Sequence, residues 1–284
     1  MSDNVTTKDN YESASNREEK LAEFEVSKRG LIGNVQHWLH QTPAAVPLIV
    51  LIASILIFGV LIGDRFFSPF ALTLVLQQVQ IFGIVAAAQS LVILTAGIDL
   101  SVGAITVFSS VIMGQFAFRY GLPPSVAVVC GLIFGTLCGA LNGFLVARVK
   151  LPPFIVTLGT WQVILASNYL YSANETIRAQ EIEANAPLLQ LMGTKFNVGG
   201  AIFTLGVIFM IALMIALAWA LRHTAWGRHV YAVGDDPEAA QLSGVDVKGT
   251  LLSVYALAGL ICGFAGWALI GRIGSVSPTS AYEA

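Results

Sequence analysis

Long apolar segments, separated by short polar ones, fill the chain from about residue 44 onward. Each is close to the ~20 residues that a helix needs to cross the hydrocarbon core of a bilayer. Only helices and closed barrels satisfy their backbone hydrogen-bonding groups there, and runs of this length favour helices. The fold class is therefore all-α, a polytopic transmembrane helical bundle of about seven spans. The predicted spans are 46–62, 70–96, 101–118, 124–147, 154–172, 200–221 and 250–270.

Residues 1–45 differ from the 46–284 membrane domain. Residues 1–17 are polar and charged, whereas 17–40 repeat apolar side chains at helical spacing. We expect a cytoplasmic polar tail followed by an amphipathic helix on the membrane surface, with a merely solvated charged tail as the alternative. The first long apolar run begins too late for a cleaved secretory signal, so it is predicted to remain as a span.

Composition supports a membrane protein and excludes several functions. The chain is 56% hydrophobic and 11% charged, whereas about 25% charged residues is typical of soluble domains. A net charge of -2 without a basic run argues against a nucleic-acid partner. The three cysteines lie in apolar runs, where a thiol usually serves packing, so neither disulfides nor metal ligands are predicted. Phosphate-binding and hydrolase motifs are absent from the sequence, so we predict no catalytic residue and no cofactor bound by this chain.

Basic residues predict the orientation in the membrane. Lys28 and Arg29 precede the first span, and Arg148 and Lys150 follow the fourth. Placing them in the cytoplasm with the other basic loops satisfies the positive-inside rule, with a cytoplasmic N-terminus and the 172–199 loop outside. The chain would then end outside the cytoplasm in the middle of a loop, so we expect the sequence to be incomplete at its C-terminus.

One polar stretch, 95–103, interrupts a long apolar region and predicts a broken helix near 97–101. Gly97 can end one helix, and Asp99 or Ser101 can cap the next by accepting its free backbone N–H groups. Asp99 is also the only charged residue between Arg65 and Arg119. An ionisable group at membrane depth indicates a transport pathway, so direct solute contact remains an alternative to capping.

Small residues recur four apart on two predicted spans. Such glycines let another helix approach closely, so they predict helix packing rather than solute binding. Asn142 lies beside the first series and is expected to hydrogen-bond between helices. The glycines are Gly131, Gly135, Gly139 and Gly143 on one span and Gly259 and Gly263 on the other.

The polar stretch 227–244 predicts a short helix outside the membrane. Asp236 suits the N-cap, Pro237 suits the first helical position, and Gly244 suits the residue after the helix. Ala239 and Ala240 would leave a low surface on which another protein could dock. A plain surface loop is the alternative.

Three separated stretches resemble the permease subunits of bacterial ABC importers for monosaccharides, such as the ribose, xylose and fructose permeases. They are 95–103 (TAGIDLSVG), 142–160 (NGFLV and LPPFIVTLGT) and 227–244 (GRHVYAVGDDPEAAQLSG). The resemblance implies an inner-membrane homodimer that receives sugar from a periplasmic binding protein and is driven by a cytoplasmic ATPase subunit. Members of that family continue for about three more spans. The residues that would couple to the ATPase are Arg228, Asp235, Asp236, Pro237, Glu238, Ala239, Ala240, Ser243 and Gly244.

The predicted function is that of the translocation subunit of an ATP-driven sugar importer, in contact with membrane lipid. The alternative from another class is an ion-coupled secondary transporter that uses Asp99. A membrane enzyme lacks a catalytic constellation, and a scaffold would show binding without flux. Polar residues within spans are the candidates for the solute pathway. They are Gln77, Gln89, Asp99, Ser101, Asn142, Thr157, Trp161 and Asn168.

Overall fold

The computed structural model describes residues 39, 42 and 45–280, and the chain divides into two units. The units are Met1–Phe67 and Ser68–Ala284. The predicted tail and surface helix fall almost entirely outside the described residues, as does the chain end at 282–284.

The first unit contains one long apolar helix. Helix α3 spans Ala45–Ile62 and continues into a 3-10 turn, η1, at Gly63–Arg65. None of the α3 side chains is buried, and the mean hydropathy of this segment is 3.0. A helix with apolar side chains on every side suits a lipid environment rather than water.

The second unit is a bundle of six long helices with short elements at its two ends. The long helices are α4 (Pro69–Leu94), α5 (Val102–Phe118), α6 (Pro124–Ala147), α7 (Pro153–Ser172), α9 (Leu205–His223) and α12 (Val247–Ile273). The short elements are α8 (Ala179–Asn185), η2 (Pro187–Gly193), β1 (Lys195–Val198), β2 (Ala201–Thr204), α10 (Ala225–Asp235) and α11 (Pro237–Leu242).

A helix forms at each of the seven positions predicted for a span. Among the described residues, five are long and apolar enough to cross a membrane: α3, α4, α6, α9 and α12. Helix α5 has only 17 residues, and twelve of them are buried. Protein rather than lipid therefore surrounds α5, so its length need not match the bilayer.

One span boundary predicted from the sequence was wrong. Residues 201–204 form strand β2 of an antiparallel hairpin, with Lys195 paired to Thr204, instead of the first turn of a helix. Gly199 and Gly200 have φ values of +61° and +87°, which glycine adopts readily and which a helix does not allow. The apolar side chains of this strand made it resemble an extension of α9.

The core of the second unit is the antiparallel pair α6 and α12. A Cβ atom built on Gly139 would lie 2.1 Å from the carbonyl oxygen of Tyr255, and one on Gly259 would lie 2.2 Å from the carbonyl oxygen of Gly135. These backbones are therefore in direct contact, and only glycine fits. Gly131 instead faces Met113 of α5.

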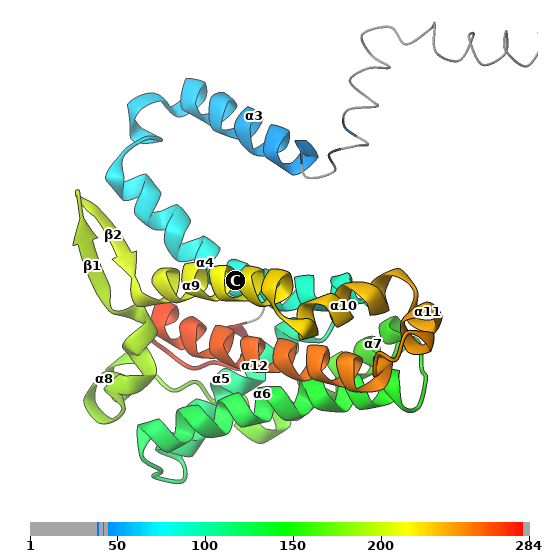
Figure 1. Ribbon diagram of the computed structural model, residues 1–284. Coiled ribbons are helices and arrows are strands. Elements are labelled where there is room, and N and C mark those ends of the chain that lie inside the picture. The colour runs from blue at the N-terminus through cyan, green and yellow to red at the C-terminus, as the bar shows by residue number, and fades with distance from the viewer. Residues whose placement is uncertain (1–38, 40–41, 43–44, 281–284) are drawn as a thin grey trace, which may run out of the picture. The chain divides into compact units, whose positions relative to one another are not determined.

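Short elements close the two ends of this bundle differently (Figure 1). Helices α10 and α11 lie at one end, which we call the α11 end. The hairpin and α8 lie at the other, the α8 end. There, Ile177 and Val276 exchange backbone hydrogen bonds of 2.9 and 3.0 Å, and Gly193 of η2 packs on Gly271 of α12. The predicted 172–199 loop is thus a folded layer.

Candidate functional site

The α11 end presents a short helix with well-formed caps. The Asp236 carboxylate accepts hydrogen bonds from the backbone amides of Glu238 and Ala239, at 2.9 and 3.0 Å. Pro237 is the first helical residue, and Gly244 follows the helix with a φ of +86°. The capping arrangement predicted for 236–244 is the one observed. The sequence did not predict the preceding helix α10.

The outward face of α11 differs from the predicted one. Ala239 is exposed, but Ala240 is buried against the rest of the bundle, so the two alanines do not form one low surface. The reason is that consecutive helical residues point about 100° apart. The side chain of Leu242 is 91% exposed, and Glu238, about one helical turn before it, is also exposed. Helix α11 therefore presents one apolar and one acidic side chain at the surface of this end.

The break in the membrane helices lies at the same end as α10. Helix α4 ends at Leu94, and Ala96 adopts a left-handed conformation with a φ of +56°. The amides of Ala96 and Gly97 bond back to the carbonyls of Ile93 and Val92, at 2.9 and 3.0 Å, which is the Schellman pattern.

Gly97 was expected to end this helix, and it does take part in the end motif, but Ala96 occupies the left-handed position. Gly97 is required for space instead. A Cβ atom there would lie 2.8 Å from the hydroxyl oxygen of Tyr255 and 2.9 Å from a methyl carbon of Val92.

The polar residues that follow the break form one buried network. The Asp99 carboxylate accepts hydrogen bonds from the Ser101 amide at 2.7 Å and from its hydroxyl at 2.6 Å. The Ser101 hydroxyl in turn accepts a bond of 2.8 Å from Asn142 of α6. Ser101 itself makes no side-chain capping bond. The network fixes the start of α5 against α6.

Helix α10 touches the break through backbone atoms. A Cβ atom on Gly234 would lie 1.9 Å from the Leu94 carbonyl oxygen and 3.3 Å from the Cα atom of Thr95. Gly234 is the penultimate residue of α10, and α11 begins at Pro237. A short rigid connection therefore joins α11 to the break.

The remaining pathway candidates are scattered. Trp161 and Asn168 of α7 both line a hollow of about 270 Å³ beside α5. Thr157 donates a bond of 3.1 Å to the Ile98 carbonyl in the break. Gln77 and Gln89 lie twelve residues apart on α4, about 18 Å along its axis, so they do not share a site.

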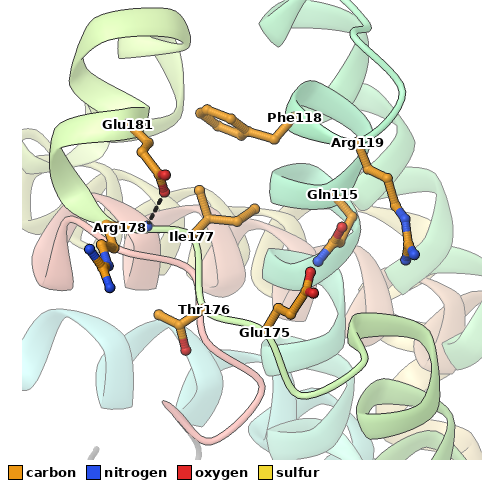
Figure 2. Close-up of a pocket in the computed structure, with 8 residues that line it drawn as sticks. All are labelled: Gln115, Phe118, Arg119, Glu175, Thr176, Ile177, Arg178 and Glu181. Carbon is orange, nitrogen blue, oxygen red and sulfur yellow. Dashed lines mark hydrogen bonds between the residues drawn. The ribbon is translucent and has the colours of Figure 1, made fainter.

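A larger hollow of about 510 Å³ lies at the α8 end, and sequence reasoning missed it (Figure 2). It forms between the last turns of α5, the link after α7 and the start of α8. Most of its lining belongs to the 172–199 loop, which the sequence analysis only placed outside the cytoplasm. We call it the α8-end hollow, and its lining residues are Gln115, Phe118, Arg119, Glu175, Thr176, Ile177, Arg178 and Glu181.

The fold defines a polytopic helical membrane protein with a capped short helix at one end and a hollow at the other. The residues 71–283 match the family model described as branched-chain amino acid transport system / permease component. The chain belongs to this family of transport-system permeases, and it is a translocation component.

Curated relatives refine the comparison. The chain is 65% identical over 260 residues to the fructose import permease protein FrcC of Rhizobium meliloti, covering 92% of this chain and 72% of that protein. It is 33% identical over 239 residues to the ribose import permease protein RbsC of Bacillus subtilis, covering 82% and 68%. It is 30% identical over 252 residues to the galactose/methyl galactoside import permease protein MglC of Salmonella typhimurium, covering 84% and 73%. No solved structure matches the chain.

Proposed function

We propose that this chain is the membrane permease subunit of an ATP-driven importer of monosaccharides. The family description names branched-chain amino acids, but the relatives described above are import permeases for fructose, ribose and galactose. An identity of 65% over almost the whole chain favours the sugar as solute class. ATP is then hydrolysed by a separate cytoplasmic subunit, and sugar arrives on a periplasmic binding protein.

The observation that carries this proposal is the geometry of α11. Its N-cap holds it as a rigid helix, Leu242 is 91% exposed, and Gly234 abuts the break at Leu94. A partner that binds α11 and moves it would therefore act on the junction between α4 and α5. We assign the ATPase-binding role to α11 and the flanking residues predicted from the sequence.

Orientation follows from this assignment. If the ATPase binds α11, this end faces the cytoplasm of an inner-membrane protein, and the N-terminus lies on the same side by the positive-inside rule. The α8 end then faces the periplasm and the sugar-binding protein. Two permease copies form the complete pathway, which opens alternately to each side.

The test uses the permease in liposomes with its ATPase and binding protein. We expect sugar-loaded binding protein to stimulate ATP hydrolysis, and Glu238→Arg to abolish that stimulation by reversing a charge on the docking surface. ATPase association is measured alongside stimulation, and Glu183→Arg, an exposed glutamate in α8 at the opposite end, should leave that association unchanged while Glu238→Arg weakens it. If the ATPase associates with neither variant nor wild type, the ABC assignment is wrong.

A further inference from the structure

The α8-end hollow is pre-formed by contacts that do not depend on a ligand. Its floor is fixed by the paired Ile177 and Val276 backbones. Gly114 of α5 lies so close to this pair that an added Cβ atom would be 2.8 Å from a Val276 methyl carbon. On the α8 side, the Arg178 amide donates a 2.9 Å bond to the Glu181 carboxylate (Figure 2).

The hollow has the volume of a small-molecule site. Its volume of about 510 Å³ lies within the roughly 300–1,000 Å³ that is usual for such sites. Gln115 reaches it from α5 and is 4% exposed, whereas the charged residues form its exposed rim. In Figure 2 the Gln115 amide and the Glu175 carboxylate point toward one another.

The chemistry of the lining selects against ions. The lining carries two guanidinium groups, of Arg119 and Arg178, and two carboxylates, of Glu175 and Glu181, so its formal charge is balanced. An anion would meet two carboxylates, and a cation would meet two guanidinium groups. A neutral polyhydroxyl solute is instead both donor and acceptor, so it can hydrogen-bond to groups of either charge.

Two further groups fit a sugar ring. The amide of Gln115 has both donor and acceptor atoms for hydroxyl groups. The ring of Phe118 lines the same hollow and offers an apolar surface to the C–H face of a sugar. A small number of polar groups beside an aromatic surface is typical of sites that orient a small polar ligand.

We infer that the α8-end hollow is the first receiving site for a neutral monosaccharide on its way into the permease. This inference rests on the proposed function, which places the α8 end on the side where sugar arrives. The hollow takes sugar released by the binding protein before it passes between the helices. Gln115 and Phe118 contact the ring, and the charged rim binds its hydroxyl groups.

A labelling experiment tests binding directly. The full-length permease with Thr176→Cys, in the hollow, is treated with a maleimide in millimolar fructose, ribose or galactose. Ala184→Cys, on exposed α8 outside the lining, is the control. We expect sugar to slow labelling at position 176 and not at 184. Equal labelling rates with and without sugar would overturn the inference, as would protection by sugar-free binding protein alone, which indicates a protein-docking surface.

An uptake experiment tests whether sugar binding in the α8-end hollow contributes to transport. Gln115→Leu keeps the volume of the side chain but removes its hydrogen-bonding groups. Sugar uptake by the reconstituted complex should fall about tenfold, as expected for the loss of one buried hydrogen bond. Gln180→Leu, an exposed α8 glutamine outside the lining, is the matched control. Equal uptake by both variants would overturn the inference while leaving the proposed function intact. Absence of sugar uptake by wild type would instead contradict the proposed function.

Discussion

The two ends of the second unit present different surfaces, and the proposals above assign them different partners. The α11 end presents exposed Leu242 and Glu238 on a capped helix. The α8 end is concave, with a hollow of about 510 Å³ and a rim of balanced charge. Hollows of this volume suit small solutes. Under the proposed function, the contact with the ATPase and the contact with the sugar are therefore at opposite ends of one bundle.

Both ends depend on the pair of helices α6 and α12. The largest effect is therefore expected from Gly259→Leu, because its side chain would overlap the Gly135 carbonyl. We expect the free energy of unfolding in detergent to fall by at least about 3 kcal/mol, since overpacking a tight contact typically costs 1–3 kcal/mol even without backbone contact. Denaturant titration measures this. Gly103→Ala, where an added Cβ atom meets nothing within 4 Å, should change stability little. Equal stability of the two variants would show that α6 and α12 do not hold the ends together.

Gly234→Ala tests the link between α11 and the break in the helices. Gly234 contacts this connection and neither the exposed face of α11 nor the α8-end hollow. The added methyl group would lie 1.9 Å from the Leu94 carbonyl oxygen, so α10 must shift. We expect ATPase binding to persist while sugar uptake per ATP hydrolysed falls about tenfold or more, as for the loss of roughly 1.4 kcal/mol of coupling free energy. The ratio of uptake to hydrolysis in liposomes measures this. Gly159→Ala, in open space on α7, is the control. An unchanged ratio would exclude transmission through this contact.

Asp236→Ala probes the rigidity of the α11 end with a smaller expected effect. Loss of an N-cap costs about 1 kcal/mol, which lowers ATPase affinity several-fold if α11 must be helical to bind. Asp246→Ala is a matched loss of a cap, because Asp246 accepts a 3.0 Å bond from the Gly249 amide at the start of α12. Affinity measured by titrating the ATPase into permease nanodiscs should fall only for Asp236→Ala. A similar fall for both variants would mean that general loosening, and not α11, sets the affinity.

The α11 end could be predicted from the sequence because its capping residues lie close together in the chain. The α8-end hollow could not, because it is formed by residues far apart in the chain. Asp236, Pro237 and Gly244 act through neighbours a few residues away, so their spacing predicts the helix. The apolar runs similarly predicted helices at all seven positions. The α8-end hollow instead joins Gln115 to residues about sixty positions later, held by a bridge from Ile177 to Val276. Such long-range contacts leave no periodic signal. The hairpin before α9 was missed for a related reason, because its apolar strand has no charge to separate it from the helix.

Asp99→Asn gives the smallest expected effect. It distinguishes ATP-driven uptake from uptake coupled to ions through Asp99. Asparagine keeps an oxygen that can accept the two bonds from Ser101, so the start of α5 should be retained. Bonds to a neutral acceptor are about half as strong as those to a carboxylate, so we expect ATP-driven uptake to fall less than about tenfold. Asparagine cannot bind or release a proton, and a carrier coupled to ions through Asp99 would lose its gradient-driven uptake completely. Uptake measured with ATP and no pH gradient, and then with a pH gradient and no ATP, separates the two mechanisms. Uptake by wild type in the second condition, lost in Asp99→Asn, would contradict the ATP-driven mechanism. Asp99→Leu, which accepts no hydrogen bond, should instead reduce the amount of folded permease, because the Ser101 amide and hydroxyl would lose their buried acceptor.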